Sequence, residues 1–186
     1  MQLFRFTIIN CFLTATSLLA GNYVIDTAQS ELAATMHATP PHNFTSVAKN
    51  FTCDIDIDPE TLAITKAICS FNFEDLDSGK DARDKKMCKW MDIEKHPTAT
   101  FEMKQLLPQN EAGEQVALGD FTMHAITQPV KVAFTLKRED DTIIIEGHSE
   151  MNHEDWGLNR VRLLFFSVDP LLKPHFRLVG KLNSDA

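Results

Sequence analysis

The segment FTCDIDIDPETLAITKAICSFNF, residues 51–73, decides the fold class of this chain. Apolar residues alternate with polar ones from Phe51 to Ile57 and again from Ala67 to Phe73. Alternation with a period of two is typical of a β-strand with one buried face and one solvated face. The turn signal Pro59-Glu60-Thr61 lies between the two arms. The segment therefore predicts an antiparallel β-hairpin.

Further alternating segments follow along the chain. They centre on residues 101–103, 121–123, 130–136, 143–145 and 176–178, with turn-forming residues at 109–113 and 139–141. No long helical pattern separates them, so consecutive strands are expected to pair as antiparallel hairpins. About eight such strands close into a barrel, which leaves no exposed sheet edge. We therefore predict an all-β fold, an antiparallel eight-stranded β-barrel whose interior holds packed side chains or one small ligand.

One short helix is expected within this β-rich pattern. Asp81 is in a position to cap it, and Met87, Trp90 and Met91 recur at the i, i+3, i+4 spacing of one apolar face. We find no internal repeat, low-complexity tract or linker, so one domain is expected from about residue 22 to 182.

The overall charge excludes some classes of partner. The net charge is −8, with an isoelectric point near 5.3. Binding to nucleic acid requires a basic face that displaces counterions, and the acidic balance argues against it. The same balance argues against docking on an anionic membrane surface.

The first 20 residues differ in composition from the rest of the chain. They contain Arg5, no acidic residue, an apolar stretch, and small residues up to Ala20. This pattern predicts a signal peptide in residues 1–20, cleaved after Ala20, and hence a periplasmic or secreted protein. The alternative is an uncleaved anchor, but the stretch is shorter than the ~20 apolar residues that a span needs. After signal removal, no stable membrane insertion is expected.

Three cysteines remain after removal of the predicted signal peptide: Cys53, Cys69 and Cys88. If the turn of the first hairpin centres on Thr61, Cys53 lies directly opposite Cys69. An oxidising compartment favours a disulfide between Cys53 and Cys69, which leaves Cys88 free. The alternative is that both residues are small buried hydrophobes without a bond.

Several phrases of the sequence resemble the YceI-like family. They are YVID at 23–26, DLDSG at 75–79 followed by RDKKM at 83–87, EKHPTATF at 94–101, GDFTMHAIT at 119–127 and DWGL at 155–158. They occur in the family's order and span almost the whole mature chain. The chain departs from the family at Ala125, where a glycine is usual, and in its cysteines, which are not general to the family.

The resemblance implies a lipocalin-like barrel with a short helix and an elongated apolar cavity. It also implies a periplasmic or secreted protein that binds a polyisoprenoid or similar long-chain lipid, for transport or storage, without catalysis and without a cofactor. The ligand is then expected to contact inward apolar side chains, and these are Phe51, Ile55, Phe71, Phe73, Met87, Trp90, Phe101, Met103, Phe121, Met123, Val132, Phe134 and Trp156. The alternative is that the same residues fill an ordinary packed core.

The sequence also contains residues that bear on functions other than binding of a lipid chain. Arg83 and Lys86 are candidates for contact with an anionic head group. The favoured alternative is a solvated helix face, partly paired with Asp81 and Asp84. The histidines lack metal-ligand spacing, and no nucleophile elbow surrounds any serine. The second hypothesis is an accessory partner of a quinone-linked membrane redox system, with no catalysis of its own. A homodimer is left open.

Overall fold

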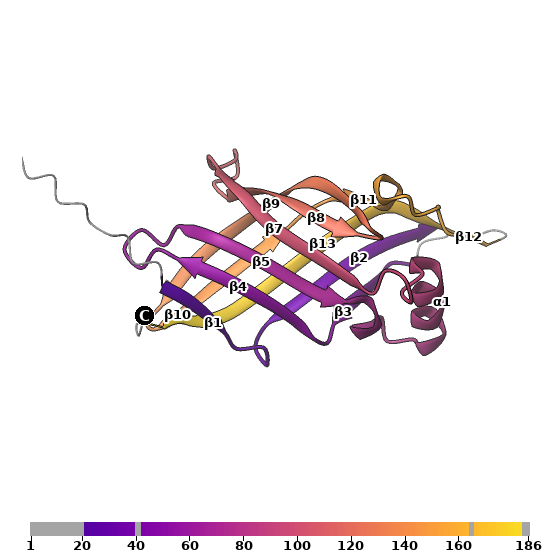
Figure 1. The fold of residues 1–186 in the computed structure, drawn as a ribbon, viewed down its shortest axis with the longest axis horizontal. Helices are drawn as coiled ribbons and strands as arrows, with labels where there is room; N and C mark the ends of the chain where they lie inside the picture. Colours follow the sequence, from indigo (N-terminus) through magenta and orange to yellow (C-terminus); the bar gives the residue numbers. More distant parts are fainter. Residues whose placement is uncertain (1–20, 40–41, 164–165, 184–186) are drawn as a thin grey trace, which may run out of the picture.

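The computed structural model describes residues 21–39, 42–163 and 166–183. It is an elongated, β-rich molecule with one α-helix at one end (Figure 1). The strands are β1 Gly21–Ile25, β2 Glu31–Thr39, β3 Phe44–Ala48, β4 Phe51–Ile57, β5 Ile64–Asn72, β6 Leu76–Asp77, β7 Thr98–Leu107, β8 Gln115–Met123, β9 Ile126–Glu139, β10 Thr142–His148, β11 Met151–Asn152, β12 Arg162–Leu163 and β13 Phe166–Asn183. The helix α1 spans Asp81–Met91, and the 3-10 helices η1 and η2 span Phe73–Asp75 and His153–Trp156.

Eight strands close into an antiparallel barrel, which confirms the predicted fold class. The strand order is β1-β4-β5-β7-β8-β9-β10-β13, and β1 pairs with β13 to close the ring. Four of the eight neighbouring pairs, β4–β5, β7–β8, β8–β9 and β9–β10, are joined by short hairpins, as expected where strands follow one another with turns between them. Closure leaves the barrel without a free edge between its first and last strands.

The long strand β13 organises the N-terminal part of the barrel. Its C-terminal residues pair with β1, and its preceding residues pair with β2, so β1 and β2 run one after the other along the same partner. The strand β3 then pairs with β2 and with β6. The sequence pattern did not predict β2 and β3. In β2 the buried residues are Ala33, Met36 and Ala38, so a spacing of three interrupts the alternation. The register with β13 also shifts, between Met36 and Ala38.

The hairpin formed by β4 and β5 has the register expected from the turn centre. Phe51 lies opposite Phe71, and the pairing continues in step as far as Asp56 and Lys66. Beyond this point the register shifts by one residue. In the turn, the Asp58 carboxylate accepts hydrogen bonds from the backbone N–H groups of Thr61 and Glu60. These bonds lower the pKa of Asp58.

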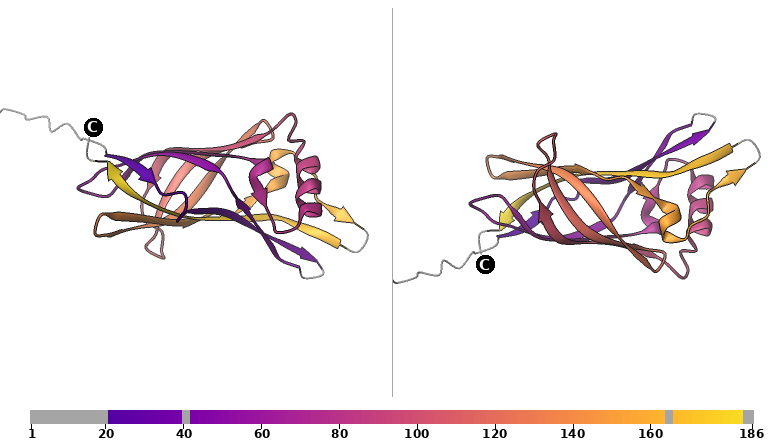
Figure 2. Two further views of the ribbon diagram at one scale, coloured as in Figure 1. Left: turned by 90° about the horizontal axis from the view of Figure 1, so that it is seen from below. Right: turned by 90° about the horizontal axis from the view of Figure 1, so that it is seen from above.

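The helix α1 lies across the end of the barrel opposite to the first and last described residues, Gly21 and Asn183 (Figure 2). The expectation that Asp81 caps it is wrong: the N-cap is Lys80, and its side chain makes no capping hydrogen bond. The Asp84 carboxylate instead accepts hydrogen bonds from the backbone N–H and the hydroxyl of Ser78. Met91 is buried, and Met87 and Trp90 are half-buried, so the predicted apolar face packs toward the barrel.

The interior is divided into two main groups of buried side chains. The first, which we call the barrel cluster, consists of Tyr23, Ile55, Ile57, Ile64, Ala117, Phe134, Ile143, Ile145 and Leu178. The second, the helix-end cluster, consists of Phe73, Met91, Ala99, Met123, Val130, Met151, Trp156 and Leu158. The helix-end cluster therefore lies between α1 and the rest of the barrel interior.

Candidate functional site: an interior apolar cavity

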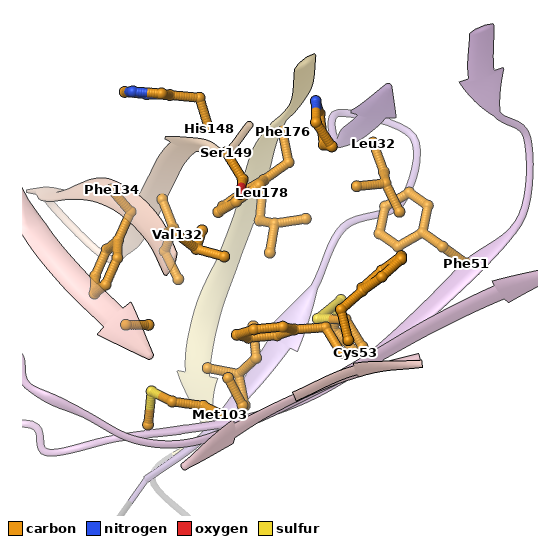
Figure 3. Close-up of a pocket in the computed structure, with 18 of the residues that line it drawn as sticks. Leu32, Phe51, Cys53, Met103, Val132, Phe134, His148, Ser149, Phe176 and Leu178 are labelled. Carbon is orange, nitrogen blue, oxygen red and sulfur yellow. A yellow bond between two sulfur atoms is a disulfide. The ribbon is translucent and has the colours of Figure 1, made fainter. Parts of the chain in front are cut away.

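A cavity of about 120 Å³ lies inside the barrel. Its wall is formed by Leu32, Phe51, Cys53, Ile55, Ile64, Ala67, Cys69, Phe71, Phe101, Met103, Ala117, Phe121, Val132, Phe134, Ile145, His148, Ser149, Met151, Pro174, Phe176 and Leu178. These residues come from β2, β4, β5, β7, β8, β9, β10, β11 and β13 and the turn after β10, so strands from all round the barrel contribute. Figure 3 shows labelled side chains such as Phe51, Met103 and Val132 converging on a common interior space.

The wall of the cavity offers almost no polar recognition. Among its residues, only His148 and Ser149 have a conventional polar side chain. The Ser149 hydroxyl donates a hydrogen bond to the Lys131 carbonyl at 2.8 Å. The His148 side chain is mostly exposed, and its Nδ1 lies 3.7 Å from a Glu114 carboxylate oxygen. The cavity therefore suits an apolar ligand, whose burial is favourable without polar contacts.

Eight of the residues predicted to contact a ligand lie in the cavity wall. They are Phe51, Ile55, Phe71, Phe101, Met103, Phe121, Val132 and Phe134. Strand alternation identifies these residues because inward-facing side chains of a small barrel point toward the axis. Ligand contact by any of them remains a prediction.

Five other predicted ligand residues are not in the cavity wall. Phe73, Met87, Trp90, Met123 and Trp156 instead belong to the helix-end cluster or pack against it. Phe73 follows the end of β5 and begins η1, so it does not continue the inward series of that strand. Met87 and Trp90 belong to α1 itself, so these five residues pack at the helix end of the barrel rather than lining the cavity.

Sequence reasoning missed several wall residues. Leu32 comes from β2, which the alternation did not reveal, and Pro174 lies within β13, where proline argues against a central strand. Phe176 and Leu178 were identified as strand residues, but their place in the cavity wall was not predicted. Pro174, Phe176 and Leu178 alternate along the chain, and this alternation could have identified all three as inward-facing residues.

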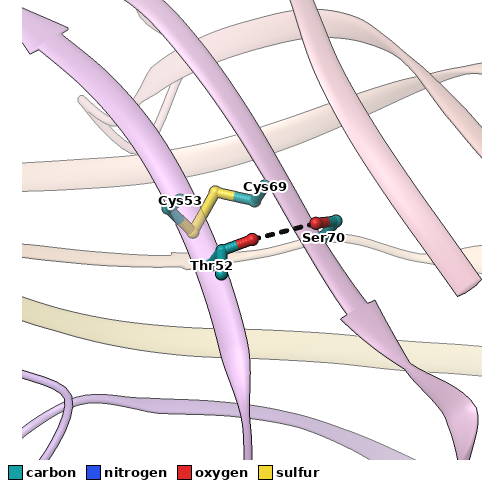
Figure 4. The surroundings of a disulfide bond; sticks show 4 residues. All are labelled: Thr52, Cys53, Cys69 and Ser70. Carbon is teal, nitrogen blue, oxygen red and sulfur yellow. Dashed lines mark hydrogen bonds between the residues drawn. A yellow bond between two sulfur atoms is a disulfide. The ribbon is translucent and has the colours of Figure 1, made fainter.

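A disulfide forms part of the cavity wall. Cys53 and Cys69 lie directly opposite each other on β4 and β5, with their Cα atoms 4.1 Å apart, and are joined by a disulfide bond (Figure 4). Beside it, the hydroxyls of Thr52 and Ser70 share a hydrogen bond of 3.0 Å. Cys88 on α1 is a free cysteine.

The two head-group candidates do not reach the cavity. The Arg83 guanidinium donates hydrogen bonds to the hydroxyl and the carbonyl of Ser78, at 2.7 and 2.5 Å, and lies 4.2 Å from the centre of the Phe44 ring. Arg83 therefore stabilises the start of α1. Lys86 is exposed on the same helix.

One buried histidine, at the start of η2, packs against α1. His153 is 1% exposed, its Nδ1 lies 3.2 Å from the Leu158 carbonyl oxygen, and its ring packs edge-on against Trp90 with centroids 5.0 Å apart. Its Nε2 has no hydrogen-bond partner among the described residues. Desolvation by burial lowers its pKa.

The described ranges contain no group of three or more His, Cys, Asp or Glu side chains placed to hold a metal ion. Within the same ranges, no helix is both long and apolar enough to cross a bilayer. The predicted signal peptide, residues 1–20, lies outside the part of the chain that the structure describes.

Comparison with solved structures shows the same fold in three bacterial proteins. BcnA from Burkholderia cenocepacia superposes with a TM-score of 0.74 at 18% identity, over 84% of this chain and 99% of its own. A polyisoprenoid binding domain from Saccharophagus degradans, implicated in plant cell wall breakdown, gives 0.62 at 14% identity, over 89% and 99%. The YCEI protein of Campylobacter jejuni gives 0.58 at 14% identity, over 75% and 85%.

No curated protein matches this chain in sequence. The YceI-like domain, in contrast, matches residues 23–178, which is most of the chain and covers the barrel strands almost completely. The phrases that suggested the resemblance all lie inside this match. This chain belongs to the YceI-like family.

Proposed function

We propose that this protein is a periplasmic or secreted binding protein that holds a polyisoprenoid or a similar long-chain apolar lipid inside the barrel, for transport or storage. The observation that carries the proposal is the interior cavity, whose wall is formed almost entirely by apolar side chains. Family membership and the fold shared with a polyisoprenoid binding domain support it. The signal-peptide pattern of residues 1–20 supports export.

The size of the cavity bears on how such a ligand would enter. Ligand pockets commonly occupy about 300–1,000 Å³, whereas this cavity measures about 120 Å³. A long-chain lipid therefore fits only after wall side chains move apart. Several wall residues are suited to this, since Met103 and Met151 are unbranched and the half-buried Phe51, Phe71 and Phe101 are not locked into the core on all sides.

The cavity adjoins the helix-end cluster. Phe71, Phe101, Phe121 and Val132 belong to the cavity wall and also pack against that cluster. Rearrangement of the cluster would therefore lengthen the cavity along the barrel axis, toward α1. An elongated space of this kind matches the shape of an isoprenoid chain better than a compact one.

Native mass spectrometry of protein purified from its source tests the proposal. We expect a mass increment that organic solvent removes, and the extract should contain an isoprenoid or quinone-like lipid. Ligand-free protein, even after addition of a polyisoprenoid, would contradict the proposal. An empty barrel that purifies with a protein partner would favour the accessory-protein hypothesis for a quinone-linked redox system instead.

A further inference from the structure

We propose that the outward face of α1 docks this protein reversibly on an anionic phospholipid bilayer. The inference rests on the proposed lipid-binding function and extends it, since it names the surface with which the lipid would be exchanged. It is carried by the position, spacing and pairing of three lysines, Lys85, Lys86 and Lys89.

These three lysines form one continuous basic stripe, which we call the lysine stripe. At 100° per residue, Lys85 and Lys89 lie one helical turn apart, and Lys86 and Lys89 lie three residues apart on the same side. The exposed Ala82 lies between them on this side of the helix, the exposed Asp81 lies one turn before Lys85 at its edge, and all three lysines are exposed. None of them takes part in an ion pair with another described residue.

The opposite side of α1 is fixed to the barrel, so the lysine stripe points away from it. Met91 is buried in the helix-end cluster, and Met87 and Trp90 pack against that cluster. The Trp90 indole N–H donates a hydrogen bond to the Asn159 carbonyl at 2.8 Å, which ties the helix to the segment after η2. The helix lies near one end of the molecule, where the ends of β2 and β13 and the strand β12 extend beyond it (Figures 1 and 2). Because its other side packs on the helix-end cluster, the lysine stripe faces solvent at that end.

The charge of the whole molecule turns this end toward an anionic surface. The chain carries a net charge of −8, whereas α1 carries four basic and two acidic residues. Lys80 directly precedes the helix. An anionic bilayer repels the acidic remainder and attracts the helix, so the encounter orients the molecule with α1 first. The net charge of the chain argued against an anionic membrane as partner. That number does not report where the charges lie, and the basic residues of α1 are gathered on one helix.

The position of the lysine stripe connects docking with the cavity. The helix covers the helix-end cluster, and that cluster adjoins the cavity wall. Docking through α1 therefore brings the boundary that must rearrange for lipid entry next to the bilayer. An acidic protein or a free anionic head group could also bind the lysine stripe. Only a bilayer gives a reason for the stripe to lie next to the end of the lipid cavity, because the bilayer is where the lipid would be exchanged.

The expected interaction is weak and sensitive to salt. Each lysine near an anionic surface strengthens binding by about fivefold, so removal of three is expected to weaken it by about 100-fold. A surface interaction of this strength is released easily, as exchange of a lipid requires, and it involves no insertion into the bilayer. Salt weakens it because the lysines are exposed to solvent.

Sedimentation with lipid vesicles tests the proposal. The full mature chain is mixed with vesicles of phosphatidylcholine containing about one third phosphatidylglycerol, and with vesicles of phosphatidylcholine alone, at low and high salt. The test variant is Lys85→Gln/Lys86→Gln/Lys89→Gln. The matched control is Lys131→Gln/Lys137→Gln/Lys181→Gln, which removes three exposed lysines from the barrel wall that make no ion pair with a described residue.

We expect the wild type and the control to sediment with the anionic vesicles at low salt, and the test variant to lose this binding by about 100-fold. Equal binding by the test variant and the wild type, or equal loss in both variants, would overturn the proposal. The proposal would also be overturned if the test variant bound the vesicles as the wild type does but, in a separate assay, lost binding to an acidic protein.

A second measurement separates this inference from the proposed function. Binding of a fluorescent isoprenoid in the absence of vesicles is expected to be unchanged in both variants, because the lysine stripe does not line the cavity. Failure of every form to bind the isoprenoid would contradict the lipid-binding function, whatever the vesicles show. Isoprenoid binding with no preference for anionic vesicles would contradict only the docking proposal.

Discussion

The ring of Phe101 lies across Gly119 on the neighbouring strand, so closely that a Cβ atom added to Gly119 would come within 2.5 Å of the ring. The Phe176 ring lies in the same way across Gly147, also at 2.5 Å. Both aromatic rings belong to the cavity wall. Glycine at these two positions therefore lets an aromatic side chain lie against the sheet instead of projecting further into the barrel.

Substitution Gly119→Ala is expected to displace the Phe101 ring into the cavity. The added methyl group also meets the Glu102 carbonyl oxygen at 2.6 Å, so the strand itself must shift. Overpacking of this kind typically costs about 1–3 kcal/mol of folding free energy. Chemical denaturation and isoprenoid titration should show lower stability and weaker binding.

The control for this prediction is Gly21→Ala. Its added methyl group would meet the flexible Leu182 side chain at 3.3 Å and the Ile57 carbonyl oxygen at an ordinary 3.6 Å, and neither residue lines the cavity. Wild-type isoprenoid affinity in Gly119→Ala would show that the Phe101 ring does not limit the space available to the ligand.

A charge in the cavity wall is expected to abolish lipid binding while the barrel persists. In Phe101→Glu, a bound lipid would remove the carboxylate from water without a partner, and burial of an unpaired charge is strongly unfavourable. Circular dichroism should remain β-rich, since Phe101 is only half-buried. Mass spectrometry should detect no retained lipid, whereas Phe101→Leu should keep it.

Met123 gives a contrasting case within the helix-end cluster. It is 4% exposed and does not line the cavity, so Met123→Glu is expected to destabilise the fold more than Phe101→Glu does. Denaturant unfolding of the two variants measures this difference. The reverse order of stability would show that the division between cavity wall and cluster is misplaced.

The disulfide is expected to stabilise the hairpin formed by β4 and β5. Cys53 and Cys69 are separated by 16 positions, and closing a loop of about this length contributes about 3 kcal/mol in the chain-entropy description. Cys53→Ala/Cys69→Ala should therefore unfold at lower denaturant concentration than the oxidised wild type. In a non-reduced digest, the peptides containing these two residues should be linked.

Cys88 supplies the control for the disulfide. It is free and half-buried on α1, so it should be alkylated without reduction, and Cys88→Ser should keep the linked peptide. Three alkylatable thiols in the exported protein, or a link that includes Cys88, would contradict the pairing.

Stability is expected to fall in mildly acidic solution because of His153. Burial lowers its pKa in the folded protein, outweighing the opposite effect of the hydrogen bond to Leu158. In the unfolded chain the pKa returns to about 6.5, so below this pH the unfolded state binds a proton that the folded state does not. The free energy of unfolding should then decrease by up to ~1.4 kcal/mol per pH unit until the folded-state pKa is reached.

Urea denaturation between about pH 7 and pH 5 measures this dependence. His153→Gln should flatten the pH profile, whereas His42→Gln, at an exposed histidine, should leave it unchanged. An identical slope in the wild type and His153→Gln would show that His153 does not contribute to the acid sensitivity.

The sequence by itself determined the hairpin and its register. Alternation from Phe51 to Ile57 and from Ala67 to Phe71 fixes which side chains point inward, and the turn fixes that Cys53 faces Cys69. The same reasoning placed eight predicted ligand residues in the cavity wall. These are local properties, because strand parity and turn length depend only on neighbouring residues.

The tertiary structure decided how far along the barrel each inward residue lies. Phe71 and Phe73 have the same parity, yet Phe71 lines the cavity and Phe73 packs under α1, because β5 ends between them. Only the pairing of β2 with β13 brings Leu32 opposite Phe176, since the two strands are far apart in sequence. Alternation distinguishes inside from outside, but strand ends, register shifts and closure determine which inward side chains leave a cavity and which fill the interior.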